Sequence, residues 1–251
     1  MTLNQRFGLR LMVASLAVFL LAVPFTGLLA LVDTRWRPLA ELDEETTKAL
    51  NGYVLDHRVF VRPLQATSYV FHAWVFRSII AVLVVWLLYR GARRLAAWAA
   101  TTIVLGGVVG LVLKLVIDRP RPVLESPIAH APGGSFPSGH AMTAAVGSAV
   151  IVMVLLPVLG AAWRAVAWAA AVAVTLASGF CRIALGVHFV SDVVAGWVLG
   201  IAVAAATAAA FEMWRRDAGR PPVHPVTDGL EPEAAPRISV TGDRDPASLD
   251  G

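Results

Sequence analysis

Hydrophobic residues along this chain gather into six long runs, and charged residues are confined mainly to the segments between them. The runs are Leu11–Val32, Tyr69–Tyr89, Leu95–Ile117, His140–Gly160, Trp163–Phe180 and Val193–Met213. A helix needs about 20 apolar residues to cross a bilayer, so each run is long enough or nearly so. The pattern predicts an all-α integral membrane protein, with a bundle of six transmembrane helices forming one domain over residues 1–214.

Composition supports this class. Of the 251 residues, 57% are hydrophobic and 15% are charged, which is more apolar surface than one soluble core of this length would bury. The first run exceeds the roughly 7–15 apolar residues of a signal-peptide core. It is therefore predicted to be a retained signal anchor rather than a cleaved peptide.

Two segments differ from the rest. Residues 33–68 mix charges with residues such as Trp36 and Leu39, which predicts short amphipathic helices at the outer membrane interface; a solvated loop is an equally good interpretation. From residue 215 the chain turns to Pro, Gly, Asp, Glu and Ser, with too little apolar content for a core. Residues 215–251 are therefore predicted to be a disordered cytoplasmic tail.

Arginines cluster at one end of the predicted bundle if the helices alternate in direction. They are Arg6, Arg10, Arg90, Arg93, Arg94, Arg164, Arg215, Arg216 and Arg220. By the positive-inside tendency this end, with both termini, is expected to be cytoplasmic. The net charge of +4 comes mostly from these residues, so no nucleic-acid partner is expected. The single cysteine excludes an internal disulfide and a four-cysteine metal site.

The opposite, extracytoplasmic end gathers costly polar groups, which are rare in membrane helices unless they serve one another or a ligand. The third run ends in "KLVIDRPRP", which carries Lys114 and Arg121. The fourth begins at "PSGH", where Ser138 is a good helix N-cap and Gly139 lets the backbone approach a ligand closely. The free amides of such a helix start attract anions, and His140 stands beside them.

The third polar stretch is "CRIALGVHFVSD", residues 181–192, between the last two runs. If the sixth helix starts near Val187, His188 and Asp192 lie four residues apart on one helical face. Asp192 can then accept a hydrogen bond from one imidazole nitrogen and leave the other free. Arg182 adds a third fixed cation to Lys114 and Arg121.

Together these groups suit phosphoryl transfer without a cofactor. Cations and helix-end amides neutralise the oxygens of a phosphoryl group in the transition state. His188 can attack phosphorus, and His140 can protonate the leaving alkoxide and later activate water. A zinc site made of two histidines and an aspartate is the rival interpretation, but the adjacent cations oppose it.

The three stretches resemble the motifs K-x6-RP, P-S-G-H and S-R-x5-H-x3-D of the type-2 phosphatidic acid phosphatase superfamily. The correspondence covers residues 95–213, with Cys181 in place of the usual serine; a thiol is a poorer donor to phosphate. The resemblance implies a membrane-embedded helical phosphatase, with catalytic His188, His140 and Asp192 and phosphate-binding Lys114, Arg121, Ser138, Gly139 and Arg182.

The expected substrate is a lipid phosphate or diphosphate: a polyprenyl diphosphate such as undecaprenyl diphosphate, phosphatidic acid, or phosphatidylglycerol phosphate. A lipid-linked phosphotransferase would use the same residues. A vanadate-dependent haloperoxidase, also built on this site, is the weaker alternative. Arg77 and Arg119 stay outside the predicted site: Arg77 is equally compatible with a buried structural pairing, and Arg119 is predicted to pair with Asp118 or Glu125 rather than with substrate.

Overall fold

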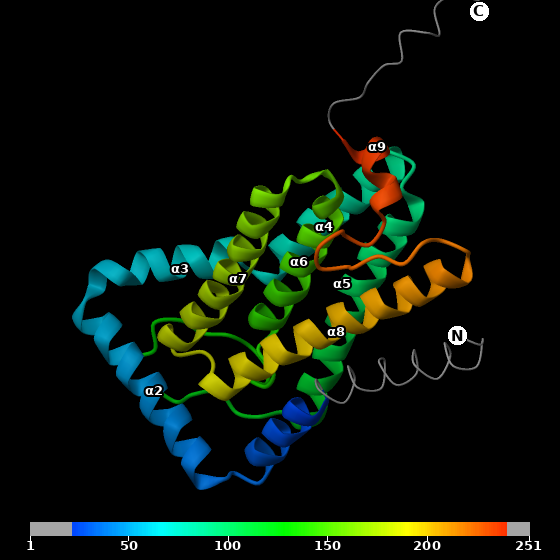
Figure 1. Ribbon diagram of the computed structural model, residues 1–251. Coiled ribbons are helices and arrows are strands. Elements are labelled where there is room, and N and C mark those ends of the chain that lie inside the picture. The colour runs from blue at the N-terminus through cyan, green and yellow to red at the C-terminus, as the bar shows by residue number, and fades with distance from the viewer. Residues whose placement is uncertain (1–21, 240–251) are drawn as a thin grey trace, which may run out of the picture.

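The computed structural model describes residues 22–239, and all regular secondary structure in that range is helical (Figure 1). The short helix Ala22–Asp33 comes first. The elements after it are α2 (Arg37–Asp56), η1 (Arg58–Phe60), α3 (Val61–Val70), α4 (Ala73–Tyr89), α5 (Arg93–Ile117), α6 (Gly139–Leu155), η2 (Leu156–Val158), α7 (Ala161–Ala184), α8 (Val190–Asp217), η3 (Pro232–Ala234) and α9 (Ala235–Ile238).

Within residues 22–239, five helical segments are long and apolar enough to cross a membrane: Arg58–Tyr89, Arg93–Ile117, Gly139–Val158, Ala161–Ala184 and Val190–Asp217. They correspond to the last five predicted runs. The first predicted run, Leu11–Val32, lies largely outside the described residues, which include its last part in the helix Ala22–Asp33.

Helix α6 is the centre of the bundle and packs against α4, α5, α7 and α8. Most of its residues are buried. Its closest neighbour is α8, because Gly196 and Gly200 of α8 face it without side chains. A Cβ atom at Gly196 would lie 2.7 Å from the carbonyl oxygen of Ser138, and one at Gly200 would lie 2.8 Å from Cβ of Ala145. Such small-residue spacing is the usual device for close helix packing in membranes.

Helices α2 and α3 occupy the segment predicted to be amphipathic, and both pack against α7. Figure 1 shows them flanking α7 on one side of the bundle. Helix α2 buries mainly polar residues. It buries Asp43, Thr47 and Asn51 along one face, whereas Trp36 at its N-cap and Leu42 are about half exposed. Three polar side chains therefore lie against the protein, while the outward face mixes charged residues such as Glu44 and Lys48 with half-exposed Leu42.

The described part of the predicted tail is ordered, which differs from the expectation of disorder. Leu230, Ala234 and Ile238 recur every four residues and are almost fully buried in the main hydrophobic cluster. Arg215 forms a two-pronged ion pair with Glu233, at 2.9 and 2.8 Å. In Figure 1 this segment covers the end of the bundle opposite α2. Hydrogen bonds from Arg164 and Trp168 of α7 to the carbonyl oxygens of Thr227 and Val226 add to these contacts, so the segment is held in place although its overall composition is polar.

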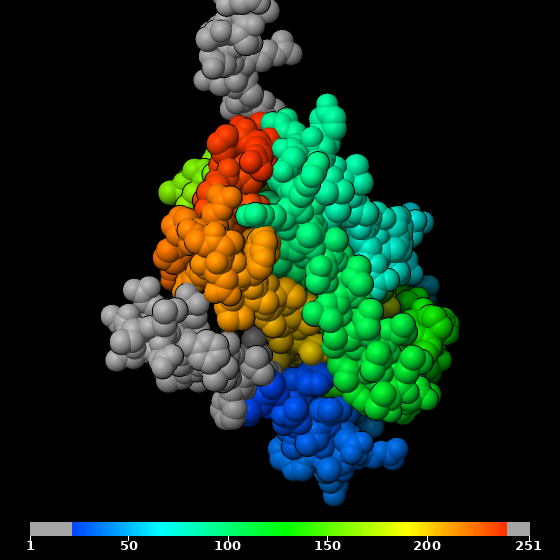
Figure 2. All heavy atoms as spheres, turned by 90° about the vertical axis from the view of Figure 1, so that its right-hand side faces the viewer, coloured from blue at the N-terminus to red at the C-terminus, as the bar shows by residue number. Residues whose placement is uncertain are grey.

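The space-filling view in Figure 2 shows the face built mainly by α5 and α8. Many of the side chains of α5 on this outer surface are large and apolar, and they are exposed at Val104, Val108, Leu111, Leu115 and Val116. A surface of this kind suits contact with lipid chains. This apolar surface and the five long apolar helices indicate an integral membrane protein.

Candidate active site

His188 lies in the short connection between α7 and α8, not on the sixth helix as the sequence predicted. Helix α7 ends at Ala184, and Gly186 then takes a left-handed conformation, with φ of 74°. The amides of Val187 and His188 fold back onto the carbonyl oxygen of Arg182, at 3.1 and 3.3 Å. Since α8 begins only at Val190, a glycine-stabilised turn, rather than helical spacing, holds His188.

Asp192 sits in the first turn of α8 and is fully buried. Its Oδ2 lies 3.4 Å from Nδ1 of His188 and accepts a hydrogen bond from the amide of Phe189 at 2.9 Å. Its backbone oxygen accepts from the amide of Ser138 at 2.9 Å, which ties α8 to the start of α6. The predicted facing of His188 and Asp192 is therefore present, although the helix does not supply it.

The local environment holds His188 in its neutral form. Burial lowers the pKa of His188 to about 4, and the hydrogen bond and charge of Asp192 oppose this shift only in part. Arg121 and Arg182 lower the pKa further. At neutral pH the imidazole is therefore uncharged, and Nε2 is available as a nucleophile once Nδ1 carries the proton.

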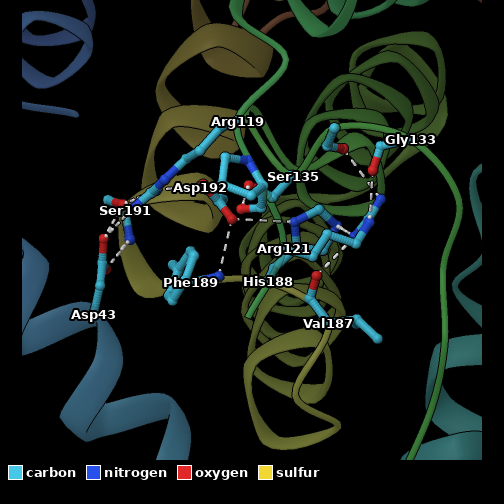
Figure 3. A network of polar contacts seen from close by, with 12 residues as sticks. Asp43, Arg119, Arg121, Gly133, Ser135, Val187, His188, Phe189, Ser191 and Asp192 are labelled. Carbon is cyan, nitrogen blue, oxygen red and sulfur yellow. Dashed lines mark hydrogen bonds and ion pairs between the residues drawn. The ribbon is translucent and has the colours of Figure 1, made fainter. Parts of the chain in front are cut away.

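Arg121 touches the reactive face of His188, with Nη1 3.2 Å from Nε2 of His188 (Figure 3). Backbone carbonyl oxygens hold the rest of its guanidinium. They belong to Pro132, Gly133, Gly134 and Val187, at distances from 2.7 to 3.2 Å. The loop before α6 thus wraps around Arg121 and fixes its charge beside the imidazole.

The start of α6 brings together the second set of predicted residues. Ser138 is the N-cap residue, but its side chain makes no capping hydrogen bond, and its buried hydroxyl has no partner among the described residues. A Cβ atom on Gly139 would lie 4.0 Å from Nζ of Lys114, so this cation sits beside the first turn of α6. The amide of Ser138 is already used by Asp192. The helix-end amides without an intrahelical partner are therefore those of Gly139, His140 and Ala141.

His140 and Arg182 each contact a residue that the sequence analysis did not single out, His72 and Ser68 respectively. The rings of His140 and His72 meet edge to face, with centroids 4.5 Å apart. Nη1 of Arg182 donates to the hydroxyl of Ser68 at 2.6 Å. Nε2 of His140 and Nε of Arg182 are buried without a partner in the described part of the chain. Such unpaired polar atoms are costly, and they suit an anionic ligand.

Arg119 and Asp43 are further residues outside the prediction. Arg119 was expected to pair with Asp118 or Glu125, but it donates to Asp192 at 2.6 Å and to Asp43 at 2.9 Å. Asp43 also accepts from the amide of Ser191 at 2.9 Å. No sequence motif distinguishes Asp43 from the other acidic residues of α2, because its partner Ser191 is 148 residues away.

Two other residues singled out in the sequence border this cluster. Arg77 is exposed on the outer face of α4, and its Nη2 lies near Gly107 of α5. The thiol of Cys181 donates to the carbonyl oxygen of Ser178 at 3.2 Å within its own helix. The substitution of serine by cysteine at this position thus leaves the side chain engaged with the backbone of α7.

The comparison with known families agrees with this geometry. Residues 95–216 match the model of the PAP2 superfamily, which contains all three polar stretches. We therefore identify this part of the chain as a member of the PAP2 superfamily, as its motifs predicted.

Two relatives refine the picture. The chain is 44% identical over 93 residues to phosphatidylglycerophosphatase B of Bacillus subtilis (strain 168), a stretch that covers 36% of this chain and 45% of that protein. The matched stretch is thus less than half of the relative's length. The crystal structure of a transmembrane PAP2-type phosphatidylglycerolphosphate phosphatase from Bacillus subtilis is also similar. Its TM-score is 0.65 at 25% identity, over 74% of this chain and 92% of that one.

Proposed function

We propose that this protein is a metal-independent phosphatase that hydrolyses a lipid phosphate through a phosphohistidine at His188. The arrangement of His188 carries the proposal. Nδ1 faces the carboxylate of Asp192 at 3.4 Å, and Nε2 faces the cation Arg121 at 3.2 Å. One nitrogen is therefore oriented by a base, and the other points to where an anion would bind.

In the first step, Nε2 of His188 forms a bond to phosphorus while the bond from phosphorus to the lipid oxygen breaks. Asp192 stabilises the positive charge that develops on the imidazole. His140 gives its proton to the departing oxygen. Lys114, Arg121 and Arg182, with the amides of Gly139 and His140, stabilise the charge on the phosphoryl oxygens.

In the second step, His140 takes a proton from water, whose oxygen attacks phosphorus as the bond to His188 breaks. Inorganic phosphate leaves, and both histidines return to their starting states. For substrate to bind, Nη1 of Arg121 exchanges its contact with His188 for a phosphoryl oxygen. The carbonyl oxygens around the rest of the guanidinium keep the charge in place during this exchange.

Phosphatidylglycerol phosphate is the proposed substrate, because both similar proteins are named as phosphatases of this lipid. The proposed phosphate-binding residues would contact only the phosphate group that all three lipids share. Phosphatidic acid and polyprenyl diphosphate are therefore the alternative substrates. The site is proposed to face the extracytoplasmic side. Arg90, Arg93 and Arg94 lie at the opposite end of the bundle, as the positive-inside tendency favours for the cytoplasmic side.

The test is phosphate release by the detergent-purified protein in EDTA, with the three lipids compared at equal surface concentration. His188→Ala is the inactive variant, and His224→Ala is its matched control, because His224 is exposed near the far end of the bundle. Release by the wild type and the control but not by His188→Ala supports the proposal. Activity that disappears in EDTA and returns with a divalent ion contradicts the metal-free mechanism, and lipid consumption without phosphate release favours the phosphotransferase.

A further inference from the structure

Asp43 is a carboxylate in an unusual position. It has no exposed surface, yet it belongs to α2, a helix outside the superfamily match that begins at residue 95. It lies on the inward polar face of α2, together with Thr47 and Asn51. A buried charge is costly unless it is paired, so the partners of Asp43 indicate what it does.

Three donors from two other parts of the chain satisfy Asp43. The amide of Ser191 donates to Oδ1 at 2.9 Å, and the hydroxyl of Ser191 donates to Oδ2. Nη2 of Arg119 donates to Oδ2 at 2.9 Å. Ser191 directly precedes Asp192, so Asp43 grips the first turn of α8 beside the catalytic carboxylate.

Arg119 bridges the two carboxylates (Figure 3). While Nη2 binds Asp43, Nη1 donates to Oδ1 of Asp192 at 2.6 Å and to the hydroxyl of Ser191 at 2.7 Å. Cζ of its guanidinium lies over the ring of Phe189, 4.4 Å from the centroid. Both terminal nitrogens and the ring contact therefore hold the guanidinium in place.

This bridge determines how Asp192 presents itself to His188. Arg119 occupies Oδ1, so Oδ2 is the oxygen left for Nδ1 of His188 and the amide of Phe189. Rotation of the carboxylate away from His188 would break a charge-assisted hydrogen bond of 2.6 Å, which is among the stronger kinds. The orientation of the catalytic carboxylate therefore depends on where Asp43 holds Arg119.

Asp43 also changes the charge balance of the group that it forms with Arg119 and Asp192. Alone, Arg119 would neutralise Asp192 and oppose the positive charge that develops on His188 during attack. With Asp43 as a second partner, the three charged groups carry a net charge of −1, so one negative charge remains to stabilise the imidazolium. Orientation and charge balance both act through Arg119, because the hydrogen bonds of Asp43 within the described residues go to Arg119 and Ser191 and not to His188 or Asp192.

We propose that Asp43 is a positioning residue of this active site, which holds Arg119 so that Asp192 stays oriented and charged toward His188. The role rests on the proposed phosphatase function. It makes α2, an interfacial helix, part of the catalytic apparatus rather than a cover over it. Removal of the charge at Asp43 should therefore slow the chemical step without weakening phosphate binding.

The test compares Asp43→Asn with Glu41→Gln, a matched change on the exposed side of the same helix, where Glu41 pairs with exposed Arg37. We expect Asp43→Asn to lower kcat by about 10- to 100-fold, the range typical when a hydrogen-bonded outer partner is removed. KM and inhibition by orthovanadate should stay within about twofold of the wild type. Glu41→Gln should match the wild type in kcat and KM.

A double-variant cycle with Arg119→Gln separates positioning from a merely structural role. Residues that act as a unit give non-additive losses, so Asp43→Asn/Arg119→Gln should be no slower than Arg119→Gln alone. Losses that multiply, an unchanged kcat in Asp43→Asn, or a loss that only follows the folded fraction in size-exclusion chromatography would each overturn the role.

If Asp43→Asn does not fold, Arg119→Lys provides the same test. Lysine keeps the charge but cannot span two carboxylates with two separate nitrogens, so kcat should fall while vanadate inhibition persists; a wild-type kcat would overturn the role. A wild-type protein that releases no phosphate would refute the proposed function and this role together. Release that is insensitive to both variants would refute the role alone.

Discussion

His188 and Asp192 face each other at 3.4 Å although only Asp192 belongs to a helix. The contact depends on two anchors: the turn after α7 that fixes the backbone of His188, and the first turn of α8 that fixes Asp192. Arg119 then sets the rotation of the carboxylate. The reactive pair is thus assembled from three segments.

Asp192→Asn should lower kcat by about 10³- to 10⁴-fold, as in other sites where a carboxylate orients a catalytic histidine. The amide preserves the shape but can present its NH₂ group to Nδ1, which favours the wrong tautomer and removes the compensating charge. Orthovanadate inhibition should change little, since Lys114, Arg182 and the α6 amides are untouched. A kcat within about threefold of the wild type would exclude the orienting role.

The pH dependence of activity follows from the pKa of His188, which burial lowers to about 4. The charged groups facing the imidazole are Asp192 from α8, Arg121 from the loop between α5 and α6, and Arg182 from α7. Since neutral His188 is the nucleophile, its titration should leave kcat/KM high down to about pH 5 and reduce it near pH 4. A kcat/KM profile from pH 4 to 8 checks this, and protonation of His188 at pH 6.5 would contradict it.

The same shift predicts a change in stability. The unfolded histidine binds a proton below about pH 6.5, whereas the folded one resists protonation until about pH 4. Stability is therefore fully present above pH 6.5 and is lost as pH falls toward 4, by about 3 kcal/mol from this group. Thermal unfolding at pH 7 and pH 4.5 should show a larger acid-induced drop in Tm for the wild type than for His188→Gln; equal drops would contradict the prediction.

Gly196→Ala should destabilise the protein and impair the site together. The new Cβ would lie 2.7 Å from the carbonyl oxygen of Ser138, at the point where α8 meets the start of α6. Overpacking of this kind costs about 1–3 kcal/mol. Gly52→Ala is the control, since nothing lies within 4 Å of its Cβ position. Comparison of Tm and kcat for both variants checks the prediction, and equal Tm values would refute it.

The sequence was sufficient for the parts of the site that lie within continuous motifs. Lys114 and Arg121 lie at and just after the end of α5, and Arg182, His188 and Asp192 lie at the end of α7 and the start of α8. Their positions at helix ends could therefore be predicted from the apolar runs. The partners of Arg119 could not be predicted, because Asp43 and Asp192 are separated by most of the bundle in sequence. Only the packing of α2 against α7 and α8 brings them together.

Local composition also misled the prediction at the C-terminal end. Residues 215–239 are polar on average, and average polarity favours disorder. Their order depends on the placement of a few residues: Leu230, Ala234 and Ile238 insert into the bundle, and Glu233 pairs with buried Arg215. The average polarity of a segment gives no information on the spacing of its few apolar residues, which here is four.

Asp43 lies on the buried face of α2, whereas Trp36 and Leu42 of the same segment are about half exposed to the surroundings of the protein. The medium around the protein therefore contacts the same helix that holds Arg119. Solubilisation changes the medium around these two side chains, which lie seven residues and one residue before the carboxylate that positions Arg119. Rates measured in micelles and in bilayers should therefore differ in turnover number as well as in substrate access, and bilayer thickness and headgroup become variables of catalysis.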